Sequence, residues 1–254
     1  MNTDWTHLEN EAEVTSPALL IYPDRVEENL RRMIARVGDP ARLRPHIKTH
    51  KLPQIVARQV ALGVTKCKCA TIAEAEMAAR AGATDILIAV QLVGPNVARL
   101  MTLLREFPQV AWATVADDAG AVEALDAAAV AGGMKSEVLL DRDVGMNRTG
   151  IAPGPAAVAL YRKIAHARGL MPGGLHAYDG HLRQSDPAER AAASDAGFAL
   201  VRALAEELKR EGLPVPRMVS GGTPTFPIHA RRAGVECSPG TCVLWDASYA
   251  AGLP

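Results

Sequence analysis

Short apolar runs of strand length alternate with longer amphipathic stretches along most of the chain. The run Asp85–Val90 is almost continuously apolar, which is typical of a strand buried on both faces of a parallel sheet. Eight runs of this kind predict strands, at Ala18–Tyr22, Arg42–Lys48, Lys66–Ala70, Asp85–Val90, Val110–Val115, Glu137–Asp141, Gly174–Tyr178 and Arg217–Ser220.

Helical periodicity fills the stretches between these strands. Asp24 is placed to cap the first helix, and Thr71 with Glu74 three residues later forms a capping-box pattern before another. The predicted helices are Arg25–Val37, Pro53–Leu62, Ile72–Ala81, Val97–Glu106, Ala119–Ala131, Pro155–Ala167 and Glu189–Glu211.

Eight strands that alternate with helices predict an α/β fold of parallel βαβ units, closed as a (β/α)8 TIM barrel. An open doubly wound sheet is the alternative. We expect an N-terminal extension over 1–14, the barrel over 15–230, and the start of a connection to a further domain over 231–254. The stretch Pro224–Pro254 has four prolines and one strand-like piece, Thr241–Asp246, so we expect the chain to be a fragment.

Composition narrows the function classes. Hydrophobic residues make up 48% of the 254 positions, enough for one large core, and 28 basic side chains balance 28 acidic ones. Bulk charge therefore gives no support for a nucleic-acid or membrane-surface partner. The start, Met1–Val14, is polar and lacks the pattern of a signal peptide, and no apolar run reaches the length of a membrane span.

The chain has four cysteines, Cys67, Cys69, Cys237 and Cys242. Their spacing fits no standard zinc ribbon, so free buried thiols are favoured over a zinc site. Free thiols indicate a reducing, cytoplasmic setting.

Polar residues gather where the predicted strands end. In a barrel of this class, chemistry takes place at the carboxyl ends of the strands. Taken singly, each cluster could be a solvated loop, but five of them converge on one rim. They are Lys48, Gln91, Asp141–Arg148, His176–His181 and Ser220–Thr223.

Lys48 is the candidate nucleophile. It lies in Arg44–Lys51, a run of eight residues that holds two lysines, two histidines and one arginine. A lysine that is partly desolvated and close to other cations has its ammonium form disfavoured. Its neutral amine can then form a Schiff base with an aldehyde.

Two glycine-bearing runs are candidate phosphate sites. In Ser220-Gly221-Gly222-Thr223 the glycines allow close approach of the backbone to an anion, and successive N–H groups can form a nest. The Thr223 hydroxyl adds a donor. Ser238-Pro239-Gly240-Thr241 offers a second patch of amide donors. Either run could also be a simple turn.

Three further side chains complete the candidate site. Arg148, in a glycine-bounded loop, could present its guanidinium to a phenolate-type oxygen, or form a surface salt bridge instead. Tyr178 shares a strand face with His176 and could contact a flat heteroaromatic ring, or simply fill the core. His181 could serve as an acid–base group, although most histidines are structural. A lysine, a phosphate cradle, an arginine and an aromatic ring together suit pyridoxal 5′-phosphate.

The chain resembles the fold-type III pyridoxal-phosphate enzymes, and within them the D-threonine aldolase and D-serine dehydratase group, which is related to the alanine racemase barrel. The motifs that carry the resemblance occur in order from about Thr15 to the last residue. They are Arg44-Pro45-His46-Ile47-Lys48-Thr49-His50-Lys51, Asp143-Val144-Gly145-Met146-Asn147-Arg148-Thr149-Gly150, Ser220-Gly221-Gly222-Thr223 and Ser238-Pro239-Gly240-Thr241.

The resemblance implies roles for individual residues. Lys48 matches the lysine that carries the cofactor, Arg148 an arginine near its phenolic oxygen, and Tyr178 a tyrosine near its ring. The implied phosphate contacts are Gly221, Gly222, Thr223, Gly240 and Thr241. We add Ser220, because it belongs to the run whose N–H groups can form the nest. The catalytic role of His181 beside Lys48 is an extrapolation from its position.

Members of that group carry a second, β-rich domain after the barrel, where a His-x-Asp or His-x-Cys pair binds a divalent metal. This sequence contains neither pair, and we expect the C-terminal β domain to be missing from it. We therefore expect a divalent metal (Mn, Mg or Zn) only in a full-length form, and assign no metal ligand here. The resemblance also implies a homodimer when full length.

These expectations predict a lyase that cleaves D-threonine-type β-hydroxy-D-amino acids to glycine and an aldehyde by a retro-aldol reaction. A D-serine dehydratase-type eliminase and an amino-acid racemase are the alternatives with the same cofactor chemistry. An alternative of another class is a non-catalytic carrier of pyridoxal phosphate built on the same barrel.

Overall fold

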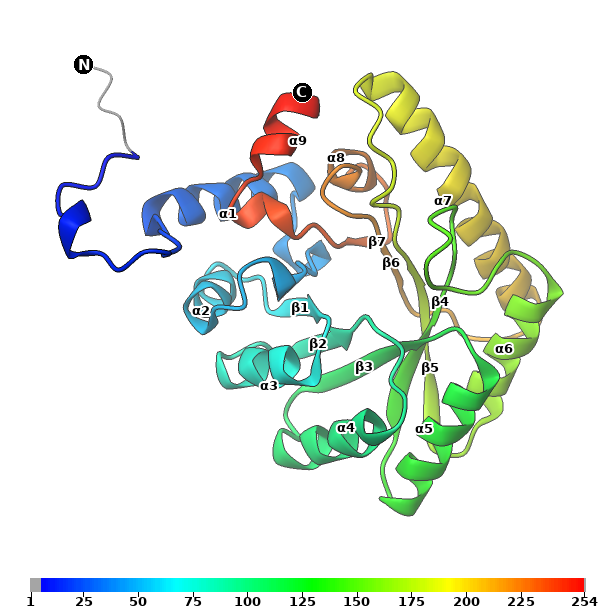
Figure 1. Ribbon diagram of the computed structural model, residues 1–254. Coiled ribbons are helices and arrows are strands. Elements are labelled where there is room, and N and C mark those ends of the chain that lie inside the picture. The colour runs from blue at the N-terminus through cyan, green and yellow to red at the C-terminus, as the bar shows by residue number, and fades with distance from the viewer. Residues whose placement is uncertain (1–5, 254) are drawn as a thin grey trace.

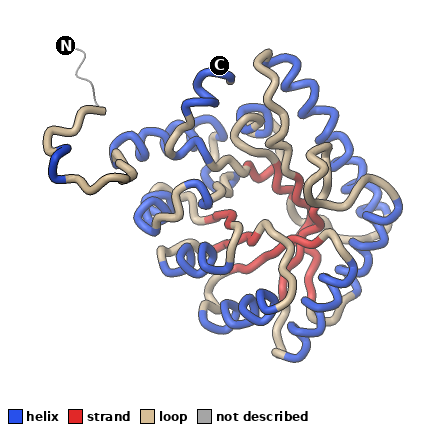
Figure 2. The backbone as a smooth tube through the Cα atoms, viewed as in Figure 1, coloured by secondary structure: helices blue, strands red, loops and turns tan. Residues whose placement is uncertain are grey.

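The computed structural model describes residues 6–253, which fold around one parallel β-sheet. Its seven strands follow the order of the chain, and each pairs in parallel with the next. Figure 2 shows the strands gathered at the centre with the helices around them. The strands are β1 (Lys66–Cys69), β2 (Asp85–Ile88), β3 (Ala111–Ala116), β4 (Ser136–Asp141), β5 (Leu170–Ala177), β6 (Met218–Ser220) and β7 (Val235–Cys237).

Helices connect the strands and cover the outside of the sheet (Figure 1). The Thr71 hydroxyl accepts from the N–H of Glu74, as the capping pattern predicts. The first α-helix begins at Pro23, so Asp24 is not its N-cap. The helices are α1 (Pro23–Val37), α2 (Pro53–Ala61), α3 (Ile72–Arg80), α4 (Pro95–Glu106), α5 (Ala119–Ala131), α6 (Pro155–His166), α7 (Pro187–Arg210), α8 (Phe226–His229) and α9 (Ala247–Gly252), with 3-10 turns η1 (Glu11–Glu13), η2 (Pro40–Arg42), η3 (Ile47–Thr49) and η4 (Thr241–Val243).

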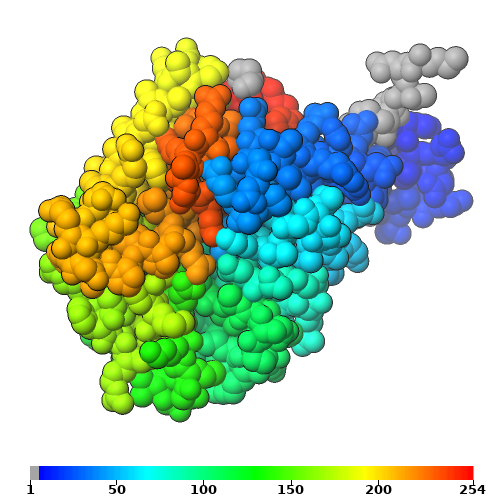
Figure 3. Space-filling view, turned by 180° about the vertical axis from the view of Figure 1, so that it is seen from behind, coloured from blue at the N-terminus to red at the C-terminus, as the bar shows by residue number. Residues whose placement is uncertain are grey.

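The extended segment 43–46 closes the sheet into a ring. Leu43 bridges Cys237 of β7 on one side, and His46 bridges Lys68 of β1 on the other. Backbone hydrogen bonds of 2.8 Å join the segment to both neighbours. Figure 3 shows the early and late parts of the chain side by side at the surface, blue beside orange. The predicted (β/α)8 barrel is confirmed, with 43–46 in the place of one strand.

Two strand predictions were wrong. Ala18–Tyr22 forms no strand, and Leu19 within it is 75% exposed. Its apolar letters therefore do not mark a core position. Thr241–Asp246 begins with the turn η4 instead of a strand.

Two other boundaries differ from the prediction. The expected strand Arg42–Lys48 is extended only over 43–46, because Ile47–Thr49 turns as η3. The strand β7, which has only three residues, was not predicted. β7 lies beyond residue 230, so the sheet itself continues to Cys237.

The barrel interior is layered. Side chains alternate along each strand, so one set packs against the helices and the other fills the ring. The middle of the interior is apolar, with a cluster made by Leu87, Ala113, Val115, Leu139 and Val219. This cluster separates the polar groups at the two ends of the barrel.

A charged cluster fills the end of the barrel where the strands begin. The fully buried Arg44 guanidinium donates to both oxygens of Asp85, at 2.7 and 2.8 Å, and to Glu236 at 2.7 Å. Lys66 adds a 2.5 Å contact to Glu236. The pKa of Arg44 is raised despite its burial, because two carboxylates surround it. The cluster therefore holds β1, β2 and β7 to the closing segment.

Residues 6–20 form an arm that extends away from the barrel (Figure 1). The arm carries η1 and is exposed along its length. The part of the predicted N-terminal extension that precedes residue 6 lies outside the described residues. Within 6–253, the helices are all too short or too polar to cross a membrane.

Candidate functional site

Two lysines and one arginine surround the ring of Tyr178 at the carboxyl ends of the strands. The Nζ atom of Lys48 lies 5.8 Å from the ring centroid, Nζ of Lys68 lies 5.6 Å from it, and Cζ of Arg148 lies 5.1 Å from it. Lys48, Arg148 and Tyr178 were predicted from the sequence to share a site, and the structure brings them together. Lys68 was not predicted.

The turn η3 presents Lys48 at this mouth. Ile47 is fully buried and anchors the turn, while the Lys48 side chain is exposed at the rim. The N–H of Lys48 donates to Nδ1 of His46 at 3.3 Å, and the N–H of His46 donates to the Pro239 carbonyl at 2.8 Å. The turn is therefore fixed to the loop after β7.

The environment of Lys48 favours its neutral amine. Partial burial, and then the positive charge of Arg148, lower the pKa of Lys48, while the Glu74 carboxylate acts in the opposite direction. A lowered pKa increases the fraction of free amine at neutral pH, which imine formation with an aldehyde requires.

The loop that carries Arg148 is organised by Asp143. Its Oδ1 accepts from the N–H groups of Gly145 at 3.0 Å and Asn147 at 3.1 Å. Gly150 closes the loop with φ +94°, and a Cβ there would lie 2.6 Å from the backbone nitrogen of Asp143. The loop can therefore close only with glycine at this position.

Two glycines make room for the Tyr178 ring. A Cβ added at Gly180 would lie 2.0 Å from the Tyr178 hydroxyl, and one added at Gly222 would lie 2.9 Å from Cε2 of the ring. Gly222 thus borders the ring, and the predicted glycine-bearing run is part of the same mouth.

The hydrogen bonds of this run differ from the expected nest of free amides. The Gly221 N–H donates to the Ala177 carbonyl at 3.1 Å, and the Gly222 N–H points to Oγ1 of Thr225 at 3.3 Å. The polar centre is instead the Thr223 hydroxyl.

Oγ1 of Thr223 accepts from the N–H groups of Gly240 at 3.2 Å and Thr241 at 3.0 Å. The two predicted phosphate runs therefore meet at one hydroxyl. Because two amides donate to that oxygen, its own proton is left for an acceptor, either the neighbouring Cys242 sulfur or a bound anion.

Two serines follow β6 and β7. Ser220 lines a small cavity with Phe198 and Val201 of α7, so its side chain lies on the helix side of the sheet. Ser238 follows Glu236 by two residues and shares its inward face by strand alternation. The Ser238 hydroxyl is buried without a hydrogen-bond partner, which is the condition of a group that a ligand could satisfy. Ser238 was part of a predicted run but was not named as a contact.

A buried carboxylate supports the Gly221-Gly222 turn from behind. Asp179 accepts from Oγ1 of Thr225 at 2.6 Å and contacts Nε2 of His229 at 2.8 Å. Burial alone would raise the pKa of Asp179, but His229 and Thr225 lower it below its usual value. His229 packs so close to Gly221 that a Cβ there would lie 2.7 Å from its ring.

His181 lies against the Arg148 loop. Its Nε2 would be 3.3 Å from a Cβ at Gly145, and its Nδ1 is buried without a partner. These contacts place His181 beside the mouth, and its role as an acid–base group stays a prediction.

The structure adds a buried chain of polar groups beneath Tyr178. Nζ of Lys68 lies 3.4 Å from Nε2 of His176, whose Nδ1 lies 2.6 Å from Oδ1 of Asp141. Sequence reasoning placed His176 and Asp141 at strand ends but overlooked Lys68. The available signal was its place between Cys67 and Cys69, where a buried strand rarely tolerates lysine.

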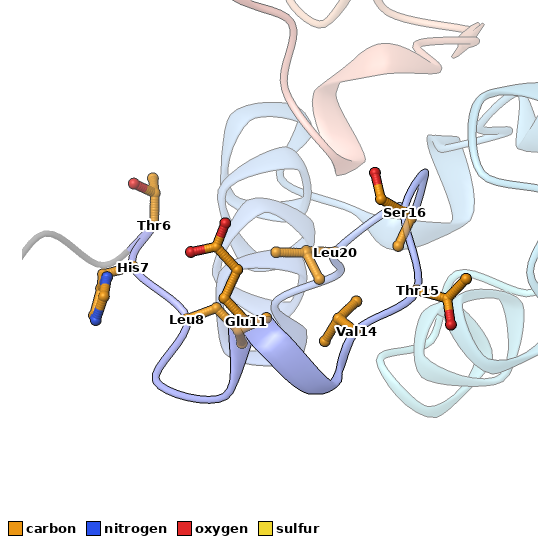
Figure 4. A pocket seen from close by; sticks show the side chains of 9 residues that line it. Thr6, His7, Leu8, Glu11, Val14, Thr15, Ser16 and Leu20 are labelled. Atoms are coloured by element: carbon orange, nitrogen blue, oxygen red, sulfur yellow. The ribbon is translucent and has the colours of Figure 1, made fainter.

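Other features of the described residues point elsewhere. A hollow on the N-terminal arm is lined by residues of that arm, including His7, Glu11 and Leu20 (Figure 4), and by none of the predicted site residues. The four cysteines are free thiols. Within residues 6–253, no three His, Cys, Asp or Glu side chains form a group that could hold a metal ion.

The chain is similar to known proteins over most of its length. D-threonine aldolase from Arthrobacter sp is 33% identical over 247 residues, covering 94% of this chain and 64% of that protein. D-threo-3-hydroxyaspartate dehydratase from Delftia sp. (strain HT23) is 32% identical, covering 91% and 61%. The chain thus spans under two thirds of the length of these relatives.

Solved structures show the same fold. The crystal structure of D-threonine aldolase from Filomicrobium marinum superposes with a TM-score of 0.88 at 33% identity, over 96% of this chain and 66% of that one. The family described as alanine racemase, N-terminal domain, matches residues 21–246. This match covers most of the barrel and the whole mouth, and the chain belongs to the alanine racemase N-terminal domain family.

Proposed function

We propose that this chain is the cofactor-binding barrel of a pyridoxal-phosphate-dependent lyase. Its reaction would cleave D-threonine-type β-hydroxy-D-amino acids to glycine and an aldehyde. The observation that carries the proposal is the Lys48 amine at the barrel mouth, beside Tyr178 and Arg148. Relatives named D-threonine aldolase and 3-hydroxy-D-aspartate aldolase support the reaction class.

The mouth fits the cofactor. The Thr223 hydroxyl, oriented by Gly240 and Thr241, and the unpartnered Ser238 hydroxyl would hold the phosphate. Tyr178 would border the ring, and Arg148 would pair with its phenolic oxygen. When bound, pyridoxal phosphate supplies an electron sink for bond cleavage at the substrate Cα.

The side chains of this barrel would bind and orient the reactants. Lys48 would hold the cofactor covalently through its neutral amine and return to that role after each turnover. His181, beside the Arg148 loop, would move a proton at the substrate hydroxyl. Cleavage requires the Cα–Cβ bond to stand perpendicular to the cofactor ring, so the groups that orient the substrate select the reaction.

The proposal also covers a divalent metal, the oligomeric state and the cellular location. The described residues do not fit a divalent metal, so any metal would be bound by parts that the longer relatives possess. We propose a homodimer for the full-length form, and a cytoplasmic setting that the free thiols support.

A dehydratase is the second candidate, because a relative that matches 91% of this chain is named D-threo-3-hydroxyaspartate dehydratase. Incubation of the cofactor-loaded protein with D-threonine and with D-threo-3-hydroxyaspartate separates the two. Glycine with acetaldehyde or glyoxylate is expected for the lyase, whereas ammonia with oxaloacetate would show the dehydratase. If the cofactor binds to Lys48 but neither set of products forms faster than with Lys48→Ala, both enzyme candidates are contradicted and a non-catalytic carrier is favoured.

Gly222→Ala is expected to weaken cofactor binding roughly tenfold. The added methyl would lie 2.9 Å from the Tyr178 ring and push it into the mouth. The measurement is equilibrium binding of pyridoxal phosphate, with thermal unfolding as a check of the fold. Gly252→Ala is the matched control, since a Cβ there meets nothing within 4 Å. Equal binding by both variants would show that Tyr178 does not border the cofactor.

A further inference from the structure

Lys68 faces the interior of the barrel. Its neighbours Cys67 and Cys69 belong to the apolar core between sheet and helices, so alternation turns Lys68 inward. It pairs across the sheet with Leu87 of the interior apolar cluster. Only 2% of Lys68 is exposed, and a lysine buried to this extent is rare unless it is paired.

The partner of Lys68 is a histidine whose other nitrogen is already committed. Asp141 accepts from Nδ1 of His176, so Nε2 of that ring is the acceptor for the Lys68 amine. The carboxylate thus reaches Lys68 only through the imidazole. Neutral Lys68 satisfies this chain, and a proton added to its amine would be stabilised by Asp141 behind His176.

Positive charge surrounds Lys68 in the described structure. Burial, then the Lys48 ammonium, lower the pKa of Lys68 to about 7, with Asp141 and Asp179 acting in the opposite direction. His46, on the adjoining segment, has its pKa held well below the usual value by burial and by both lysines. Titratable and charged groups from three parts of the chain face Lys68. The segment 43–46 and the turn η3 contribute Arg44, His46 and Lys48. Strand β4 and the loop after it contribute Asp141 and Arg148, and β5 and the loop after it contribute His176, Tyr178 and Asp179.

An anion at the mouth would reverse this balance. Negative charge near a lysine favours the ammonium form, and the amine beneath Tyr178 lies as close to that ring as Lys48 does. We propose that Lys68, backed by His176 and Asp141, takes up one proton from solvent when an anionic ligand binds at the mouth. The bound anion is thereby matched by a cation from below. The inference rests on the proposed function for the identity of the ligand, an aromatic phosphate ester.

The proposal fixes a direction for the pH dependence. Above about pH 7 the free protein carries neutral Lys68, so binding must draw a proton from solution. Affinity for the anion then falls as pH rises, by up to tenfold per pH unit, until the raised pKa of the complex is passed. The phosphate group is dianionic above its second pKa of about 6, so it does not titrate between pH 7 and 9. The pyridine nitrogen of such a ligand does titrate in this range, but its contribution is common to all variants and is removed by comparing them.

The test uses pyridoxine 5′-phosphate, which lacks the aldehyde and cannot bond to Lys48. Calorimetric titrations between pH 7 and 9, in buffers of different ionisation enthalpy, count the protons taken up. Near pH 8 we expect the unmodified chain to take up roughly one proton more than Lys68→Met, whose affinity at pH 7 is roughly tenfold weaker. Lys66→Met is the matched control on the same strand, where the lysine contacts Glu236 at the other end.

A direct titration makes the result independent of the variant's folding. Lysine side-chain 15N NMR of the unmodified chain should show one amine that titrates near pH 7. The pKa of this amine should rise when the probe binds. Proton uptake by Lys68→Met equal to that of the unmodified chain would overturn the inference alone. So would a pKa of that amine that stays unchanged while the probe binds. Failure of the unmodified chain to bind the probe would overturn the proposed cofactor site and this inference with it.

Discussion

Lys48→Ala is expected to abolish covalent attachment of pyridoxal phosphate and to lower the rate of aldehyde release by a factor on the order of 10³ to 10⁶. The reason is that the Lys48 amine is exposed at the mouth, with its pKa lowered by partial burial and by Arg148. The measurements are borohydride fixation followed by peptide mass spectrometry, and glycine formation from D-threonine.

The neighbouring Lys51 provides the matched control for that experiment. Its side chain is 63% exposed and pairs with Glu74, so Lys51→Ala should keep the fixed cofactor and most of the activity. Lys68 is the main alternative attachment site, because its amine lies at nearly the same distance from Tyr178 as the Lys48 amine does. A pyridoxyl group found on the Lys68 peptide of the unmodified chain would show that the Lys48 assignment is wrong.

The barrel could be predicted because periodicity and capping residues are local signals. The helix Ala119–Ala131 has the predicted bounds, and the Thr71 cap forms as expected. The misplaced strands have physical reasons. Ala18–Tyr22 has the composition of a strand, but Leu19 and Leu20 stay exposed and only Ile21 is known to pack against a core cluster. The three-residue β7 is too short to show a period. In the segment 43–46, pairing on both sides supplies what the local pattern lacks.

The part of the candidate site that depends only on which residues follow the strands was predictable. Lys48, Arg148 and Tyr178 each follow a strand, and a closed ring brings such ends to one mouth. The use of individual hydrogen bonds was not predictable. The Gly222 N–H points to Thr225, and whether an amide is free depends on partners that sequence spacing does not identify.

The chain of Lys68, His176 and Asp141 shows the same limit more strongly. The lysine and the histidine are 108 residues apart, and they meet only because β1 and β5 face each other across the ring. A buried lysine flanked by cysteines signals that a partner must exist. The fold is needed to say which partner it is.

Arg44→Ala is expected to destabilise the barrel by about 3–5 kcal/mol. Arg44 is fully buried and is the shared partner of Asp85 and Glu236, so its removal leaves two largely buried carboxylates short of positive charge. Lys66 and Arg217 still contact these carboxylates, which favours the lower part of that range. Urea unfolding at pH 7 measures the difference. The matched control is Arg162→Ala, whose solvent-exposed pair with Glu211 should contribute far less to stability.

The pH dependence of that difference has a definite sign. Burial alone would raise the pKa values of Asp85 and Glu236, but Arg44 and the neighbouring cations bring both below their usual values. Groups with depressed folded-state pKa values stabilise the fold above their unfolded pKa, about 4, and that contribution is lost as pH falls through the folded value. The gap between the unmodified chain and Arg44→Ala should therefore narrow below about pH 4. A loss as small as that of Arg162→Ala, or a gap that widens in acid, would show that the cluster does not hold the closing segment to the ring.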